Sequence, residues 1–159
     1  TFITFSSNPE LVEICGQTLE EKLRYIQSSS WGFSTNLEAV FDLILRTAVN
    51  AGTPQEEMPS TLFIISDMEF NGAVENPDKT IYENAKAAFE AKGYQLPAVV
   101  FHNVSSWQMQ TPVRAHTKGT ALASGTGTNS FNYKFDGNIT PMDHMLRVLN
   151  SPRYAAVHA

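Results

Sequence analysis

The segment TLFIISDMEF, Thr61 to Phe70, decides the fold of this chain. Its apolar run, Leu62 to Ile65, is rich in β-branched and aromatic residues, which predicts a central strand buried on both faces. Ligands of open α/β sheets bind just beyond the carboxyl ends of the strands. Asp67 and Glu69 follow this strand directly, so we expect a carboxylate site there of the kind that attracts a divalent cation.

The composition is that of an ordinary globular protein. The 159 residues fit a single domain, residues 1–159, with 42% hydrophobic and 17% charged side chains. No apolar run is long enough to span a bilayer, so we expect no membrane association. The lone Cys15 cannot form an internal disulfide; we expect it to be a small buried residue, and the protein to be cytoplasmic. The formal charge of -5 argues against strong nucleic-acid binding by this chain alone.

Strand and helix patterns alternate along the chain. Strands are expected near residues 1–7, 11–15, 61–66, 97–103 and 120–124. Helices are expected near 19–28, 37–51 and 80–92, and from Thr140-Pro141 onward, where Met142, Met145, Leu146 and Leu149 form a packing face. Capping boxes at Thr18/Glu21 and Thr80/Glu83 begin two of these helices. The alternation predicts an α/β fold with a mostly parallel sheet between layers of helices.

Three loops carry the candidate site. Ser34-Thr35-Asn36 precedes the helix at Leu37, where Thr35 or Asn36 also suits the N-cap position. Ser66-Asp67 ends the strand at 61–66, and His102-Asn103 ends the next one. A hydroxyl, a carboxylate and waters together make an oxygen-rich site suited to Mg²⁺.

Several of these segments resemble a known family. WGFSTN at 31–36, VFDLIL at 40–45 and FIISDMEF at 63–70 resemble the von Willebrand factor A domain, in particular its intracellular, TROVE-like version in bacterial, viral and plant proteins. Residues 1–9, 100–103 and 140–154 fit the same family, so the resemblance covers nearly the whole chain. It implies a three-layer Rossmann-like fold and a metal-ion-dependent adhesion site, in which a protein partner's carboxylate shares a Mg²⁺ ion.

The resemblance implies metal ligands at matching positions. Thr35 matches the family's threonine, and Asp67 matches the aspartate that follows the next central strand. The Asp-x-Ser-x-Ser motif has no match here. The family's first strand is therefore expected upstream of Thr1, which makes this chain an N-terminally truncated domain. The candidates to support the metal ligands by hydrogen bonds are Ser34, Asn36, Glu69 and His102.

Plainer interpretations stand beside each of these roles. Asp67 can cap a neighbouring loop or helix, Thr35 can serve only as a helix cap, and His102 can be a buried, hydrogen-bonded structural residue. The chain has no nucleophile elbow, dinucleotide fingerprint or phosphate loop. We therefore expect a non-enzymatic protein-interaction module. The alternatives are an RNA-associated, ribonucleoprotein-type module that meets RNA through other domains, a degenerate scaffold without metal, and a hydrolase using a metal-bound water.

Overall fold

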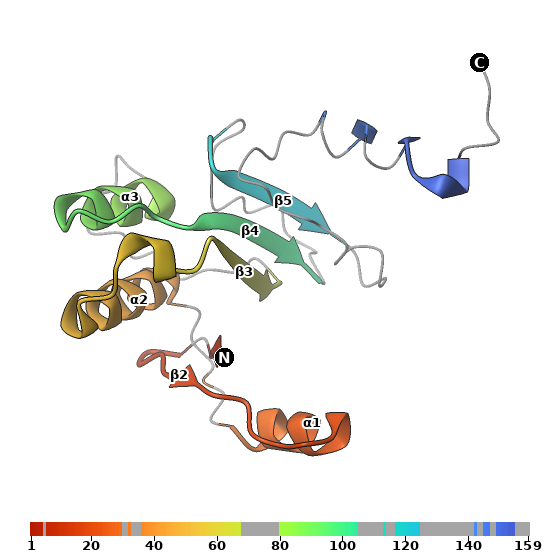
Figure 1. Ribbon diagram of the computed structural model, residues 1–159, viewed down its shortest axis with the longest axis horizontal. Helices are drawn as coiled ribbons and strands as arrows, with labels where there is room; N and C mark the ends of the chain where they lie inside the picture. The colour runs from red at the N-terminus through yellow and green to blue at the C-terminus, as the bar shows by residue number, and fades with distance from the viewer. Residues whose placement is uncertain are drawn as a thin grey trace. The chain divides into compact units, whose positions relative to one another are not determined.

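The computed structural model describes residues 1–4, 6–29, 32, 36–67, 80–104, 113, 117–124, 142, 145–146 and 149–154. In these residues it is a mixed α/β structure with a three-stranded parallel sheet and three α-helices (Figure 1). The chain divides into two compact parts. One contains the N-terminal strands and the helices. The other contains the parallel sheet and the C-terminal segment. That residues 1–159 form a single domain stays a prediction.

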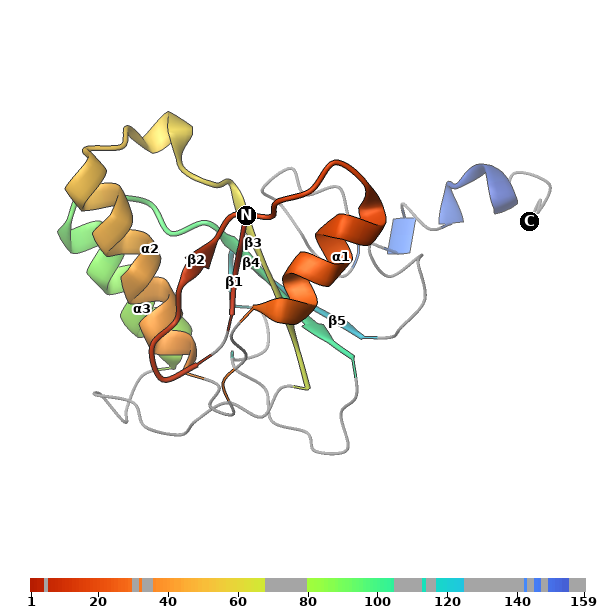
Figure 2. The ribbon, with the colours of Figure 1, turned by 90° about the horizontal axis from the view of Figure 1, so that it is seen from below.

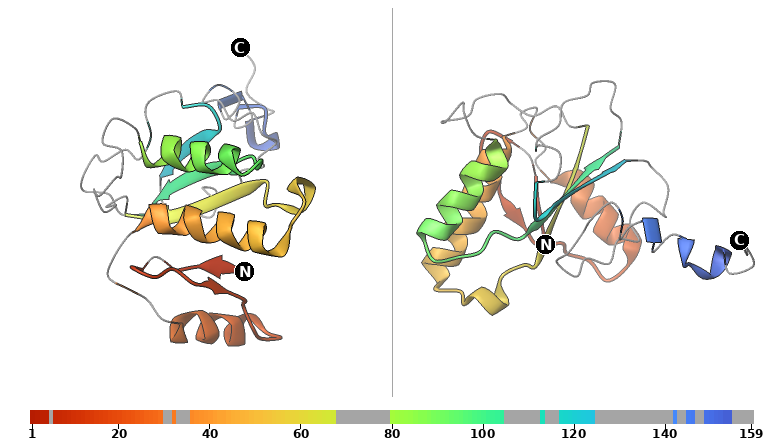
Figure 3. Two further views of the ribbon diagram at one scale, coloured as in Figure 1. Left: turned by 90° about the vertical axis from the view of Figure 1, so that its left-hand side faces the viewer. Right: turned by 90° about the horizontal axis from the view of Figure 1, so that it is seen from above.

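The first two strands form a ribbon of their own. β1 (Phe2–Ile3) pairs antiparallel with β2 (Leu11–Val12), with Phe2 opposite Val12 (Figure 3). Both strands were expected, but as members of one mostly parallel sheet, and in the described residues they pair only with each other. The connection between them is too short for a parallel crossover, which requires about a dozen residues or more.

The three predicted helices of the first part are confirmed. α1 (Leu19–Ser28) and α3 (Ile81–Ala91) each begin with the expected capping box, at Thr18/Glu21 and Thr80/Glu83 respectively. α2 (Leu37–Ala51) ends at Gly52, whose φ of 61° is a left-handed conformation that favours glycine. A short 3₁₀ turn, Gln55–Glu57, follows.

Helices α2 and α3 lie side by side and share an apolar core (Figure 2). Phe41 and Leu45 on α2 and Phe89 on α3 are all buried, and Phe89 has no exposed surface. Tyr94, just after α3, donates a hydrogen bond from its hydroxyl to the carbonyl of Thr53 at 2.9 Å. This bond joins the chain beyond α3 to the chain beyond α2, so both packing and hydrogen bonding hold the pair together.

The sheet of the second part has the order β3-β4-β5 and is wholly parallel. It consists of β3 (Thr61–Ser66), β4 (Ala98–Asn103) and β5 (Thr120–Ser124). The strands that the sequence predicts are therefore present, and their parallel pairing is confirmed.

The predicted burial of the first of these strands is wrong. We expected the run Leu62 to Ile65 to be central and buried on both faces, but β3 lies at one edge of the described sheet. Phe63 and Ile65 are 40% and 51% exposed, whereas the alternating Ile64 is only 3% exposed. The strand that is buried on both faces is β4, where four consecutive residues, Val99 to His102, have no exposed surface.

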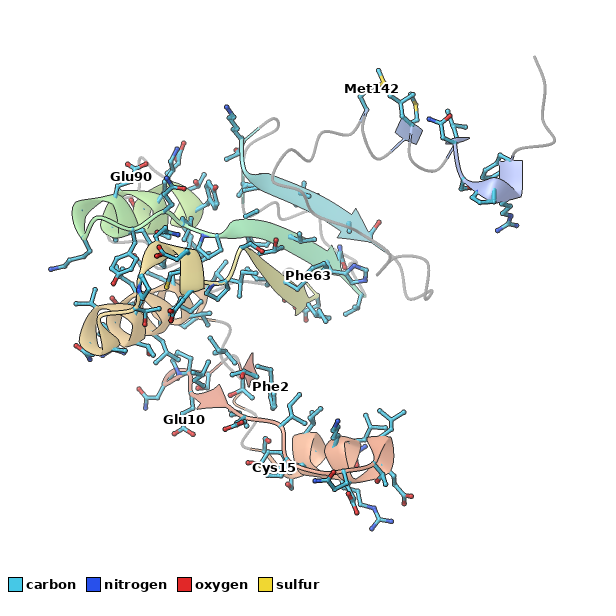
Figure 4. All side chains as sticks on the ribbon, in the orientation of Figure 1. Phe2, Glu10, Cys15, Phe63, Glu90 and Met142 are labelled. Atoms are coloured by element: carbon cyan, nitrogen blue, oxygen red, sulfur yellow. The ribbon has the colours of Figure 1, made fainter. Side chains whose placement is uncertain are left out.

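Two further expectations about burial fail. Cys15 is exposed rather than buried, because it lies in an irregular segment between β2 and α1 (Figure 4). The described residues of the last helical segment are helical as predicted. The side chains that we expected to pack there, Met142, Met145, Leu146 and Leu149, are about half exposed. A 3₁₀ turn, Pro152–Tyr154, follows that segment. None of the helices in the described ranges is long and apolar enough to cross a membrane.

Candidate functional site

The candidate site lies where the three parallel strands end. Ser66 on β3 is in register with Asn103 on β4, and Asn103 is in register with Ser124 on β5. Register partners in a parallel sheet point to the same face, so these two hydroxyls and one amide form a row along the carboxyl edge. The chemistry of this row is neutral, polar and rich in oxygen.

Asp67 adds a carboxylate directly beyond this row. It is exposed, and its Oδ1 atom accepts a hydrogen bond of 3.3 Å from the hydroxyl of Ser66. The backbone N–H of Val104 donates to the carbonyl of Ser66 at 3.1 Å, which extends the ladder between β3 and β4 by one residue. The backbone immediately before Asp67 is therefore held against the end of β4, and this fixes where the carboxylate emerges.

His102 occupies the interior of the sheet rather than its edge. Its register partners are Ile65 and Ala123, and it has no exposed surface. Because successive strand residues point to opposite faces, its imidazole lies on the other face of the sheet from Ser66 and Asn103. This position favours the structural interpretation of His102 that was left open above, and its predicted support of the metal ligands stays a prediction.

The remaining candidates precede α2 or follow β3 in the sequence. Asn36 is the N-cap of α2: its Oδ1 atom accepts a hydrogen bond of 3.0 Å from the backbone N–H of Ala39. Of the two candidate N-cap residues, Asn36 is therefore the one for which the structure shows a capping hydrogen bond. Ser34, Thr35 and Glu69 lie outside the described residues. The expected closeness of Thr35 to Asp67 accordingly stays a prediction.

The donor set at the strand ends suits a hard cation better than a soft one. Asp67, Ser66 and Asn103 offer only oxygen and amide groups, and such oxygens are the ligands that Mg²⁺ prefers. No group of three or more His, Cys, Asp and Glu side chains that could hold a metal occurs in the described ranges. The site that the sequence predicts has one carboxylate within this chain, Asp67, together with the hydroxyl of Thr35.

Sequence reasoning assigned no role to Ser124 and did not align it with Ser66 and Asn103. The strand at 120–124 was expected, yet its order in the sheet and its register could not be read from one sequence. The signal was present all the same, because a polar residue ends each of the three strands. Neighbouring parallel strands that end in polar residues present them at one common edge.

A second polar feature lies in the other part of the protein, between α2 and α3. A groove of about 500 Å³ opens there, within the size range of small-molecule pockets. Its lining combines apolar residues with two amides and two carboxylates: Asn36, Glu38, Ala39, Phe41, Asp42, Leu45, Asn84, Ala85, Ala88 and Phe89. The Nδ2 atom of Asn84 is buried and has no hydrogen-bond partner within the described part of the chain. Such a donor destabilises the fold unless something accepts its hydrogen bond.

Comparisons with known proteins give a family and one viral relative. The model of the DUF7788 family, described as a domain of unknown function, matches residues 1–144. An uncharacterized protein, L728, of Acanthamoeba polyphaga mimivirus is 33% identical over 149 residues. That match covers 92% of this chain but only 26% of the viral protein, so the chain spans about a quarter of its relative's length. No solved structure matches.

Proposed function

This chain belongs to the DUF7788 family, a domain of unknown function, and we propose that it is a metal-dependent protein-interaction module. In this proposal Asp67 and Thr35 hold a Mg²⁺ ion at the carboxyl edge of a three-layer, Rossmann-like sheet. A carboxylate of a protein partner completes the coordination of the ion. The protein binds its partner and performs no reaction on it.

The observation that carries the proposal is the position of Asp67. Its exposed carboxylate follows β3 at the carboxyl edge of a parallel sheet, beside the in-register Ser66 and Asn103. This edge is where open α/β sheets bind their ligands. The resemblance of residues 31–36 and 63–70 to von Willebrand factor A segments supports the choice of ion and the pairing of Asp67 with Thr35.

An exposed carboxylate suits a shared ion for a physical reason. Mg²⁺ keeps several of its waters and takes only one or two protein carboxylates. An ion held by Asp67 with a hydroxyl and waters therefore retains positions from which an incoming carboxylate can displace water. The described edge row carries no charge, so Asp67 cancels only one of the two positive charges of Mg²⁺. The remaining positive charge attracts a second carboxylate.

The test measures how a carboxylate and the ion affect each other's binding. The intact protein is titrated with Mn²⁺ as a Mg²⁺ substitute, alone and with a short peptide that carries one central glutamate. Because linked ligands strengthen each other equally, the glutamate peptide should raise the Mn²⁺ affinity, and its glutamine counterpart should not. Asp67→Ala should weaken Mn²⁺ binding at least about tenfold, whereas the control Glu57→Ala, at an exposed carboxylate in the 3₁₀ turn after α2, should leave it unchanged.

The outcomes separate the alternatives. If Asp67→Ala binds Mn²⁺ as the wild-type protein does, the proposed site is wrong. If the wild-type protein binds neither the ion nor the glutamate peptide, the domain is a scaffold without metal, and the proposal is equally overturned. If the glutamate and glutamine peptides have the same effect, the ion is not shared with a carboxylate.

A further inference from the structure

The groove between α2 and α3 has a floor of apolar side chains. Phe41 and Leu45 from α2 and Phe89 from α3 line it and are buried, with exposed fractions of 2%, 6% and 0%. The lining also contains three small residues, whose side chains leave the space between the two helices unfilled: Ala39, Ala85 and Ala88. The resulting volume of about 500 Å³ is that of a small-molecule site and is far larger than an ordinary packing void.

The rim of the groove is negatively charged on the α2 side. Glu38 and Asp42 both line it and are one helical turn apart. The basic side chains of the two helices, Arg46 and Lys86, are not part of the described lining. Arg46 pairs with Asp42 at 3.3 Å, but these side chains are 65% and 61% exposed, so water screens most of their attraction. The described lining therefore carries two formal negative charges, which favour a cationic ligand.

On the α3 side of the groove, Asn84 supplies a hydrogen-bond donor. Its Nδ2 atom is buried and has no hydrogen-bond partner in the described part of the chain, which costs free energy in the unliganded protein. The terminal torsion of an asparagine side chain is soft, so rotation of the amide can turn this atom toward the groove. An acceptor oxygen on a ligand in the groove would then satisfy the donor.

We infer that this groove binds a small organic amine that has an apolar body and one hydrogen-bond acceptor. The apolar body lies against the floor, the ammonium group lies beside the carboxylates of Glu38 and Asp42, and the acceptor receives the N–H of Asn84. Both helices belong to one compact part of the protein, so the groove lies within that part. The inference does not rest on the proposed metal site.

Three matched probes separate the contributions of charge and hydrogen bonding. Phenylalaninol has an aromatic ring, an ammonium group and a hydroxyl oxygen. Phenylpropanol with a terminal hydroxyl lacks only the amine, and phenethylamine lacks only the hydroxymethyl group. Probes of this size are expected to bind with about millimolar affinity, which NMR titration of the full chain measures. Phenylalaninol should shift the methyl signals of Ala39, Ala85 and Ala88, and it should bind about threefold more tightly than either other probe.

Two exposed alanines of α3 provide a matched pair of variants. Ala88→Leu fills the groove and should abolish binding of all three probes, whereas Ala87→Leu, at a position outside the described lining, should not affect it. Asp42→Asn should weaken binding of the two amines about threefold and leave phenylpropanol unchanged. The control is Glu90→Gln, because Glu90 is also an exposed helical carboxylate with a basic partner four positions away, Lys86, but lies outside the described lining.

Asn84→Ala gives a readout that a purely structural role would not produce. It should reduce the affinity for phenylalaninol to that for phenethylamine, and phenethylamine itself should bind as it does to the wild-type protein. An equal effect of Asn84→Ala on both amines would contradict the assigned hydrogen bond. Equal affinities for phenylalaninol and phenylpropanol, binding that survives Ala88→Leu, or no binding of any probe would each overturn the inference.

Discussion

Ser66 and Asn103 are register partners at the carboxyl ends of two neighbouring parallel strands, and the N–H of Val104 bonds the carbonyl of Ser66 at 3.1 Å. This relationship fixes the backbone from which Asp67 projects. It also places a hydroxyl and an amide beside the exposed carboxylate. The described side of the candidate site is thus made by the ends of two hydrogen-bonded strands.

The N-cap of α2 should contribute measurably to stability. Asn36→Ala removes the side-chain oxygen that accepts the N–H of Ala39 at 3.0 Å, and we expect a loss of about 1 kcal/mol in the free energy of unfolding. Asn36→Asp retains an acceptor and should lose much less. Urea denaturation of the three proteins measures both values. Equal losses for the two variants would show that the capping bond does not stabilise the helix.

The hydroxyl of Tyr94 should stabilise the α2–α3 pair. Tyr94→Phe deletes the donor that bonds the carbonyl of Thr53 at 2.9 Å and leaves the ring in place, so we expect a loss of about 1 kcal/mol. Tyr25→Phe, on the exposed helix α1, is the matched control and should change stability by less than about 0.5 kcal/mol. Denaturation curves that cannot distinguish the two variants would contradict this role of the hydroxyl.

Replacing Asn84 should make the protein more stable. Its Nδ2 atom is buried without a hydrogen-bond partner in the described structure, and alanine has the higher helix propensity. We therefore expect Asn84→Ala to raise the free energy of unfolding by about 1 kcal/mol. A loss of stability would show that the amide has an acceptor in solution.

The capping box of α1 should weaken in acid. Hydrogen bonds from the backbone N–H groups of Thr18 and Gln17 hold the pKa of Glu21 below its ordinary value. A carboxylate with a lowered folded-state pKa stabilises the helix above its unfolded value, about 4.3, and this contribution is lost as the pH falls through the folded pKa. The amide proton shifts of Thr18 and Gln17, followed by NMR during acidification, should titrate below that value. They should not titrate in Glu21→Gln, and a midpoint at or above the ordinary value would contradict the capping box.

Local signals in the sequence predicted the individual elements well. The boxes at Thr18/Glu21 and Thr80/Glu83 and the glycine at position 52 act within a few residues, so helix boundaries could be read directly. The parallel strands also followed from their apolar runs. Local signals of this kind do not depend on what packs against the element.

Burial and strand order were predicted less well, because they depend on distant segments. The run Leu62 to Ile65 looks like a central strand, yet β3 lies at the edge of the described sheet and β4 is the strand covered on both faces. The apolar stripe from Met142 to Leu149 predicted a packing face without naming what it packs on. For the candidate site, the sequence predicted that Asp67 lies beyond the end of a strand. The register that places Ser124 beside Asn103 could be read only from the folded structure.

The central claim is that Asp67 binds a cation at the carboxyl edge of the sheet together with Thr35. Paramagnetic broadening of backbone amide signals by Mn²⁺, in the intact protein, tests it most directly. We predict that broadening centres on Asp67, Val104 and Thr35, that Mg²⁺ competes it away, and that Asp67→Ala abolishes it. Broadening that persists in Asp67→Ala, or that spares Thr35 while affecting Asp67, would contradict the account.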